Sequence, residues 1–511
     1  MGERIAETFR TRYKPLLVVL IAAWIAFALG GCSGNEAGET NLSDRQDERM
    51  AISIMYPLYG NKPLKSEVWK YIERMFNMDY KPMAIPINSY QAKLKTAVLS
   101  GKTPDALVWT SFPSSDLLGL IHSGMFHELD PYIEQAPNLR KLPQEIWNNA
   151  KMDGKLYGIP RPRARVDRAV MIRKDWLDRL QLPMPKTIDD YYRTAVLFTK
   201  NDPDGNGKND TYGFAAGKGL DYLHELKYAF DTGNGWRVME DGLLMASRIS
   251  PGQQAYLDWL RRLYQAGGID PDFSVLKPTQ VWERFVEGKT GIIIAPITNY
   301  AWFHEELSAN DPNTELVMAG PPIGPTGAFG FEEKIGFYGM FLIPKSVPEE
   351  KVKRIVEFLD WQAGDEGTYV KLYGLEGVHH IVDANEGVLL DRGKIASEGV
   401  DSLFSMNAYD PYVYVSYDAP EQVQARQKEM LDLVRDQGVS NPALGYVAPV
   451  QLTIGSIYTE KIRSFDTDYV RGVLSKGAFE EFRREWLDKG GERATAEVNE
   501  WYRSRKKETN R

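Results

Sequence analysis

The chain has 511 residues, a formal net charge of -8 and a hydrophobic content of 43%, which is ordinary for a globular protein. An acidic chain argues against nucleic acid as the partner, because phosphate binding requires clustered Lys and Arg. The length exceeds what one hydrophobic core usually organises, so we expect two domains.

The N-terminus has the pattern of a secretory signal peptide. Basic residues precede an apolar run at 16–29, which is short for a membrane span and typical of a signal-peptide core. The following Leu29-Gly30-Gly31-Cys32 resembles the bacterial lipobox, whose cysteine is lipidated and becomes the mature N-terminus. We therefore predict a signal peptide at 1–31 and lipid on Cys32, with a buried structural thiol as the alternative. Cys32 is the only cysteine, so no internal disulfide is expected.

A polar segment follows the cysteine. Residues 33–50 have no hydrophobic periodicity, which is typical of a flexible chain. Such a segment spans roughly 25 Å root-mean-square. We predict that 32–50 is a lipidated tether that holds a globular body close to a membrane.

The body begins with alternating strand and helix patterns. The predicted strands are 52–56, 84–88 and 104–110, and the predicted helices are 65–76 and 90–100. This β-α-β-α-β order predicts an open, largely parallel sheet with helices on both faces.

Later elements continue the α/β pattern. Thr187 to Asp190 has the form of a capping box that opens a helix at 188–199. The other predicted helices are 252–266, 279–287 and 346–362, a buried strand is predicted at 290–295, and 336–344 is a further apolar run. The segment 420–505 reads as helices with little strand.

The loop at 202–214 carries oxygen-bearing side chains on alternate residues. Asp202, Asp204, Asn206 and Asp210 take positions 1, 3, 5 and 9 of an EF-hand-like calcium loop, and Lys208 offers its carbonyl at position 7. Gly207 stands at the sharp-turn position, but Gly213 stands where an EF-hand has a bidentate glutamate. We predict a structural Ca²⁺ site, with a solvated Asx and Gly turn as the alternative.

Motifs for catalysis are incomplete. His224 and His304 each precede a glutamate, as in a zinc-protease helix, but the second histidine is absent from both. No Gly-x-Ser-x-Gly motif occurs. A glycosidase needs only two well-placed carboxylates, so an enzyme acting on polysaccharide stays open as an alternative.

An ordered series of short stretches resembles the extracellular solute-binding lipoproteins of carbohydrate ABC importers, and more closely the large lipoprotein group of spore-forming Gram-positive soil bacteria. The matching stretches are 102–105, 153–160, 172–177, 202–214, 267–273, 287–295 and the helices from Phe482 to Tyr502. Each is weak alone, but their order together with the lipobox is specific. Alginate-oligosaccharide binders of the same superfamily carry a calcium loop at this place, so the resemblance also implies the metal.

The resemblance implies a two-lobed, periplasmic-binding-protein-like (type II) α/β fold. Each lobe would be an open, mainly parallel sheet flanked by helices, with the ligand between the lobes. The expected lobes are 51–163 with 320–390, and 164–319 with 391–511.

A sugar has apolar faces for aromatic stacking and polar edges for hydrogen bonds. Trp109 and Trp302 fall where relatives have stacking tryptophans, and Tyr56 follows the first strand. Arg161 and Arg163 lie in the expected crossing segment, where guanidinium groups suit hydroxyls or a uronate. The predicted ligand-binding residues are Tyr56, Trp109, Arg161, Arg163, Trp236, Tyr300 and Trp302. Core packing of the aromatics and a hinge salt bridge of the arginines are the alternatives. Tryptophans within helices, Trp282 among them, are assigned to core or interface.

The sequence thus predicts a non-catalytic, monomeric binding protein on the outer face of the cell membrane, anchored through Cys32. In a Gram-negative host it would be a periplasmic lipoprotein. It would capture an oligosaccharide by lobe closure and deliver it to the transmembrane subunits of an ABC permease. The rival hypothesis is a secreted, calcium-containing polysaccharide hydrolase or lyase.

Overall fold

The computed structural model describes residues 49–112, 114–382, 388–417, 419–446 and 448–509. The predicted signal peptide and Cys32 lie outside the described residues. The first strand, β1, begins at Met50, so the structured body starts just before the predicted end of the tether. None of the helices in the described part of the chain has the length and hydropathy needed to cross a bilayer.

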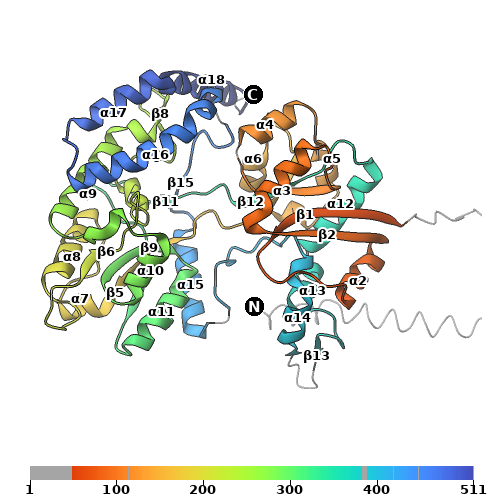
Figure 1. The fold of residues 1–511 in the computed structure, drawn as a ribbon, viewed down its shortest axis with the longest axis horizontal. Coiled ribbons are helices and arrows are strands. Elements are labelled where there is room, and N and C mark those ends of the chain that lie inside the picture. Colours follow the sequence, from red (N-terminus) through yellow and green to blue (C-terminus); the bar gives the residue numbers. More distant parts are fainter. Residues whose placement is uncertain (1–48, 113, 383–387, 418, 447, 510–511) are drawn as a thin grey trace, which may run out of the picture. The chain divides into compact units, whose positions relative to one another are not determined.

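The first lobe is built on a five-stranded sheet (Figure 1). Its strand order is β2 (Met78–Pro86), β1 (Met50–Leu58), β3 (Ala106–Trp109), β12 (Phe337–Leu342) and β4 (Gly158–Pro162). β1 is parallel to β2 and β3, whereas β12 runs antiparallel to β3 and β4. All four residues of β3 are buried, which requires cover on both faces of the sheet.

Helices of the first lobe come from two separate parts of the chain. They are α2 (Glu67–Met75), α3 (Ile87–Leu99), α4 (Ser115–His122), α5 (Asp130–Ile133), α6 (Gln144–Ala150), α12 (Glu349–Gln362), α13 (Asp365–Tyr373) and α14 (Arg392–Glu398). A short hairpin of β13 (His380–Val382) and β14 (Val388–Leu390) follows α13. One hydrophobic core joins these helices to the sheet.

The second lobe has a four-stranded sheet. Its order is β10 (Leu316–Ala319), β5 (Arg168–Arg173), β9 (Thr290–Pro296) and β6 (Tyr212–Phe214). β6 is parallel to β9, and β5 is antiparallel to both β9 and β10. Each lobe therefore has an open, mainly parallel sheet with one antiparallel strand, as predicted.

The second lobe also contains the C-terminal helices. Its helices are α7 (Lys174–Arg179), α8 (Ile188–Lys200), α9 (Pro251–Gln265), α10 (Pro278–Val286), α11 (Asn299–Asn310), α15 (Glu421–Val434), α16 (Pro449–Arg471), α17 (Ala478–Trp486) and α18 (Glu492–Thr509). Two small strand pairs, β7 (Trp236–Val238) with β8 (Leu244–Ala246) and β11 (Phe331–Glu332) with β15 (Gly438–Val439), complete it.

The capping box of α8 is present as predicted. The Asp190 N–H donates to the Thr187 hydroxyl at 3.2 Å, and the Thr187 N–H donates to the Asp190 carboxylate at 2.9 Å. Hydrogen bonds from the backbone N–H and the side chain of Thr187 to the Asp190 carboxylate lower the pKa of Asp190 to about 2.

The second strand starts earlier than predicted. The sequence pattern favoured 84–88, but β2 covers 78–86 and its last predicted residues already begin α3. Asp79, Lys81 and Pro82 interrupt the apolar pattern by which a strand is predicted. They are tolerated because β2 is an edge strand whose polar residues face solvent.

Two lobe boundaries also differ from those expected. The second core still contains Phe331, and the first core resumes at Phe337, so the expected return at 320 comes too early. The first core then includes Val400 to Met406, beyond the expected exit at 390. Short apolar runs of this kind fit either core, and only tertiary packing decides which one they join. The chain crosses between the cores at 160–165, 332–336 and 407–414.

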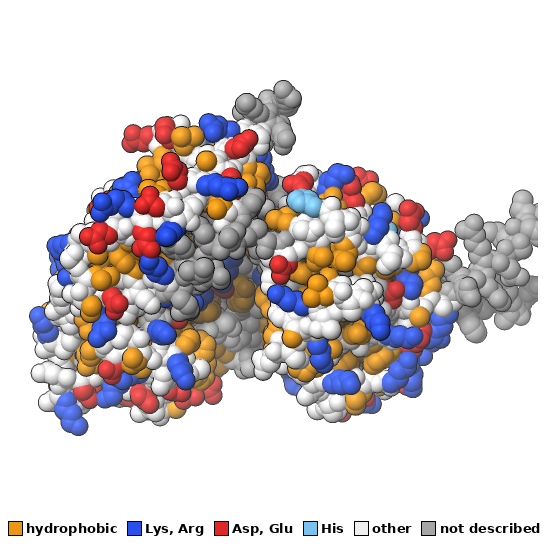
Figure 2. All heavy atoms as spheres, turned by 45° about the horizontal axis from the view of Figure 1, so that its top comes forward, with side chains coloured by type: hydrophobic (Ala, Val, Ile, Leu, Met, Phe, Trp, Pro, Cys, Tyr) orange, Lys and Arg blue, Asp and Glu red, His pale blue; other side chains and the backbone are white. Residues whose placement is uncertain are grey.

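The surface carries charges of both signs. Figure 2 shows Lys and Arg interspersed with Asp and Glu over the face that it draws. This mixing is typical of a globular surface that stays in water.

Candidate ligand-binding site

Four of the predicted ligand-binding aromatic side chains are buried. Tyr56 donates a hydrogen bond to the Ser402 carbonyl at 2.6 Å, and the Tyr300 hydroxyl donates to the Leu316 carbonyl at 3.0 Å. The exposed fractions are 2% for Tyr56, 4% for Trp109, 6% for Trp236 and 0% for Tyr300. A ring enclosed by protein has no free face for a sugar, so the structure places these four side chains in the lobe cores.

Trp302 is exposed, as a stacking residue must be. Its exposed fraction is 37%, and its indole N–H donates to Glu306 at 3.1 Å. Its ring lies 5.9 Å from the ring of Trp282, which the sequence pattern had assigned to core or interface. The two tryptophans form an edge-to-face pair at the side of a pocket in the second lobe.

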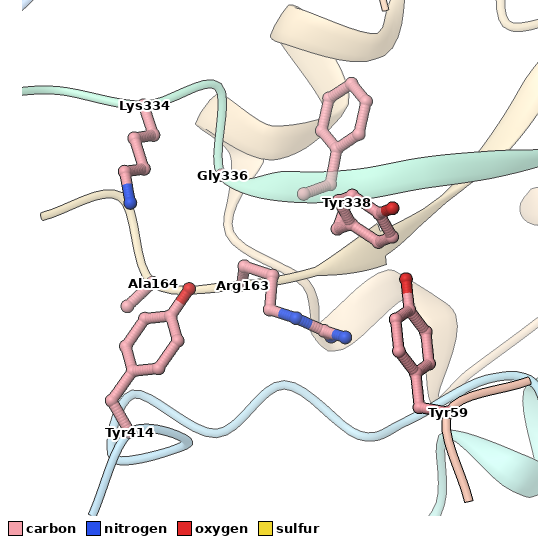
Figure 3. A pocket seen from close by; sticks show the side chains of 8 residues that line it. Tyr59, Arg163, Ala164, Lys334, Gly336, Tyr338 and Tyr414 are labelled. Carbon is pink, nitrogen blue, oxygen red and sulfur yellow. The ribbon is translucent and has the colours of Figure 1, made fainter. Parts of the chain in front are cut away.

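Arg163 lies in a cavity of about 330 Å³ at the carboxyl end of the first sheet. Tyr59 follows β1, Tyr338 belongs to β12, and Tyr414 comes from the third crossing segment. The cavity is lined by Tyr59, Arg163, Ala164, Lys334, Gly336, Phe337, Tyr338 and Tyr414. Figure 3 shows the Arg163 side chain extending toward Tyr59 and Tyr338. We call this cavity the hinge pocket.

Two more cations lie beside the hinge pocket. Arg161 is 6% exposed and donates from Nε to the Ser405 carbonyl at 2.8 Å. Its Nη1 has no hydrogen-bond partner among the described residues. Burial and the adjacent Arg163 lower the pKa of Arg161 to about 10. Burial, together with Arg161, lowers the pKa of Lys371 to about 8, although Asp401 opposes this shift.

No carboxylate forms an ion pair with any of these three cations in the described part of the chain. Arg163 donates to the Pro162 carbonyl at 2.7 Å, and Lys371 donates to the Asn407 side chain. The hinge salt bridge that the sequence left open for Arg161 and Arg163 is therefore absent from the described residues. Neutral oxygens solvate the cations but leave their charge uncompensated.

The second lobe has a pocket of opposite character. It has a volume of about 380 Å³ and lies where β9 ends and β5 begins. Its lining is Arg168, Asp221, Tyr222, His224, Glu225, Trp282, Ile294, Pro296 and Glu332. Glu225 accepts a hydrogen bond from the Glu332 N–H at 2.7 Å, and burial raises its pKa. We call this cavity the acidic pocket.

The crossing segments tie the two pockets together. Lys334 of the hinge pocket pairs with Asp167 at 2.6 Å, and the adjacent Arg168 lines the acidic pocket. Arg165 forms an ion pair with Glu333 on the same two segments. Two ion pairs therefore join the first and second crossing segments, which form walls of both pockets.

The loop at 202–214 gathers its carboxylates around one side chain. Asn206 Nδ2 donates to Asp204 at 2.8 Å and to Asp210 at 3.1 Å, while the Gly207 N–H donates to Asp202 at 2.9 Å. Asp210 also pairs with Lys289 at 2.7 Å. Burial and the neighbouring Asp202 raise the pKa of Asp204. Carboxylates that crowd one another in this way have the chemistry of a cation site.

The loop does not present a finished metal cage. Among the described residues, no group of three or more His, Cys, Asp or Glu side chains is placed to hold a metal ion. The Asn206 side-chain oxygen accepts from the Lys208 N–H at 2.7 Å and so points away from the carboxylates. A flip of this amide would turn the oxygen toward them. The residues fit calcium in kind, and the calcium site stays a prediction.

These lobes, the crossing segments and the pockets beside them define a binding protein with two lobes. The family model for bacterial extracellular solute-binding proteins matches residues 73–378, so the chain belongs to this family.

Two curated relatives from Bacillus subtilis (strain 168) are similar over nearly the whole chain. The polygalacturonan/rhamnogalacturonan-binding protein YtcQ is 28% identical, with 97% of this chain and 99% of the relative covered. The lipoprotein LipO is also 28% identical, with the same coverage.

Solved structures with the same fold include the Streptococcus pneumoniae ABC-transporter substrate-binding protein FusA. A complex with kestose and an EF-hand mutant with fructo-nystose each have a TM-score of 0.64 and 18% identity. Each likeness covers 90% of this chain and the whole of the other. At this identity the likeness shows the fold alone.

Sequence reasoning missed Tyr59, Lys334, Tyr338, Lys371 and Tyr414. One signal was available, because the residue just after a parallel strand faces the site whereas the strand's own residues face the layers. Tyr59 follows β1 in this way, and Tyr56 lies inside it. Lys371 and Tyr414 reach the site only through the third crossing of the chain, which short-range patterns do not reveal.

Proposed function

We propose that this protein captures an oligosaccharide that contains uronate residues and delivers it to an ABC importer. The carboxylate of a uronate would approach Arg163 in the hinge pocket. Tyr59, Tyr338 and Tyr414 would offer ring faces and hydroxyls to the sugar. Closure of the lobes around the ligand would supply the signal for transfer.

The observation that carries the proposal is the cluster of Arg161, Arg163 and Lys371. Cations that are withdrawn from water without an anionic partner destabilise the unliganded protein. A bound carboxylate compensates them, and an arginine fork matches carboxylate geometry with two parallel hydrogen bonds. A neutral sugar would leave the cluster uncompensated.

The relatives agree with this substrate class only in part. YtcQ, by its name, binds polygalacturonan and rhamnogalacturonan, which contain galacturonate. FusA is described with kestose, a neutral fructan. The uronate preference is therefore proposed from the cation cluster of this chain, and kinship alone supports only an oligosaccharide.

We further propose that the protein acts as a monomer anchored outside the cell through lipid on Cys32. The lipobox-like sequence and the relationship to LipO, named as a lipoprotein, support the anchor. The partners would be the transmembrane subunits of the permease.

We also propose that the loop at 202–214 binds a structural Ca²⁺ through Asp202, Asp204, Asn206, Asp210 and the Lys208 carbonyl. The crowded carboxylates support this, and so does the existence of an EF-hand in FusA. The ion would hold the loop between α8 and β6 and would take no part in ligand binding.

The hydrolase or lyase alternative gains no support, since the family, YtcQ and FusA are all named as binding proteins. Chromatography of the ligand after incubation with the protein provides the direct test, because a binder returns the oligosaccharide intact.

Calorimetric titration of the chain from residue 33 tests the proposal. Trigalacturonate should bind, and neutral galactotriose of the same length should bind much more weakly. Arg163→Gln should weaken trigalacturonate binding roughly 10- to 100-fold, as expected for loss of a charge-assisted hydrogen bond. Lys353→Gln on the exposed face of α12 removes the same charge and should leave binding unchanged. Equal affinity for both sugars would contradict the uronate preference.

A further inference from the structure

The acidic pocket carries a net negative charge. Asp221, Glu225 and Glu332 line it, against the single arginine Arg168. Two carboxylates already face that arginine, because its Nε lies 3.6 Å from Asp167 and 3.9 Å from Glu225, although Nε makes no hydrogen bond among the described residues. A second uronate placed here would therefore meet three carboxylates and one arginine whose charge Asp167 and Glu225 already balance.

The other side of the acidic pocket is aromatic. The rings of Tyr222 and Trp282 lie 6.3 Å apart in an edge-to-face arrangement, and Trp302 continues the aromatic surface beyond Trp282. The Trp282 indole N–H is buried without a hydrogen-bond partner among the described residues. Carboxylates accept hydrogen bonds from sugar hydroxyls, and an aromatic wall stacks on the apolar face of a sugar ring. These features suit a neutral sugar.

The two pockets adjoin along the second crossing segment. Glu332 lines the acidic pocket, and Lys334, two residues later, lines the hinge pocket. Two residues of extended chain span roughly 7 Å. The Asp167–Lys334 ion pair connects the same two walls through the first crossing segment. Neighbouring rings of one oligosaccharide can therefore meet both pockets.

We infer that the ligand is a mixed oligosaccharide, with a uronate ring in the hinge pocket and a neutral ring next to it in the acidic pocket. This inference rests on the proposed function and adds that charged and neutral rings follow one another along the ligand. Discrimination would come mostly from repulsion, because a homopolymer of uronates brings a carboxylate against Glu225 and Asp221. A cost of that kind lowers the affinity for the competitor without requiring any extra attraction to the correct ligand.

A comparison of the affinities for two acidic tetrasaccharides tests the inference. Tetragalacturonate carries a carboxylate on every ring, whereas a rhamnogalacturonan tetrasaccharide alternates uronate with neutral rhamnose. Calorimetric titration of the chain from residue 33 should show tighter binding of the alternating sugar by about tenfold. Glu225→Gln keeps the side-chain shape and removes the charge. This variant should therefore bind tetragalacturonate more tightly, and the difference in affinity between the two sugars should become smaller than tenfold.

A matched carboxylate outside the pocket provides the control. Glu305 is exposed on α11, and Glu305→Gln should leave the ratio of the two affinities unchanged. If tetragalacturonate binds as tightly as the alternating sugar and Glu225→Gln has no effect, the order of charges is overturned while the uronate preference stands. If neither acidic sugar binds but a neutral one does, the proposed function itself fails.

Discussion

Lys371 titrates close to neutral pH. Its pKa of about 8 arises because burial, and then Arg161, disfavour the charged form. Below pH 8 the ammonium is charged and attracts a uronate, and above pH 8 this attraction is lost. We therefore predict that the affinity for an acidic oligosaccharide falls as pH rises from 7 to 9, measured by calorimetric titration.

The variant Lys371→Met provides the comparison, since it should bind the acidic sugar more weakly at pH 7 and lose most of the pH dependence. An unchanged slope in this variant would assign the titration to another group. Stability should change in the opposite direction from affinity. Between about pH 8 and the ordinary lysine pKa of 10.5, the unfolded chain holds a proton that the folded chain has released. The contribution of Lys371 to stability therefore increases with pH over that range.

Thr187 satisfies an otherwise free N–H at the start of α8 through its hydroxyl. We predict that Thr187→Ala lowers the free energy of unfolding by about 1 kcal/mol, as is usual for loss of an N-cap. Urea denaturation measures this change. Thr187→Ser keeps the hydroxyl and should stay close to the parent protein, whereas an equal loss in both variants would point to lost methyl packing.

At the scale of elements, we predict that the loop between α8 and β6 couples Ca²⁺ binding to stability. If Ca²⁺ binds only the folded loop, saturation at 100 times the dissociation constant adds about 2.7 kcal/mol. A chelator should then lower the melting temperature by about 3–5 °C, measured by differential scanning calorimetry.

Asp204→Asn separates the metal from the loop itself. It removes a carboxylate that is crowded by Asp202 and Asp210, so the variant should not be less stable than the parent protein in chelator. It should, however, gain less from added Ca²⁺. If neither chelator nor calcium changes the melting temperature of the parent protein, the loop is a solvated turn without a metal.

The elements that sequence patterns predicted well are those with a strong local signal. The helix α8 has a capping box, α12 has a clear apolar face, and β9 is a buried run of β-branched residues. The edge strand β2 has no such signal, because only two of its nine residues are buried. The strand β4 contains prolines and an arginine, yet it is fully buried because it lies next to β12 in the sheet.

At the scale of the whole molecule, lipid on Cys32 is the predicted anchor of the protein. We predict that the intact chain fractionates with the membrane of an expressing Gram-positive cell and that Cys32→Ser is found in the medium. Immunoblotting of the membrane and medium fractions measures this distribution. The secreted variant should still bind trigalacturonate, because the described body from residue 49 contains both cores. Retention of Cys32→Ser in the membrane would assign anchoring to another segment.

The candidate site was only partly visible in the sequence. Arg163 and Trp302 were predicted and lie at or beside the two pockets, whereas Tyr56, Trp109, Trp236 and Tyr300 were predicted and are buried. An aromatic residue at the end of a strand has the same local pattern whether it faces the core or the ligand. Its exposure depends on which helix or crossing segment covers it.

The sequence by itself determined the family, the α/β class and the order of most elements, because these depend on periodicity, caps and short motifs that are local in the chain. Only the tertiary structure decided which residues form the site. The hinge pocket combines Tyr59 after β1, Tyr338 of β12 and the crossing segments, and Tyr59 and Tyr414 are far apart in sequence. The acidic pocket combines residues of β5, β9, α10 and β11 with the segment 221–225. The charge of each pocket likewise depends on which ion pairs form in the folded protein. Lys334 forms an ion pair with Asp167, whereas Arg163 has no carboxylate partner among the described residues.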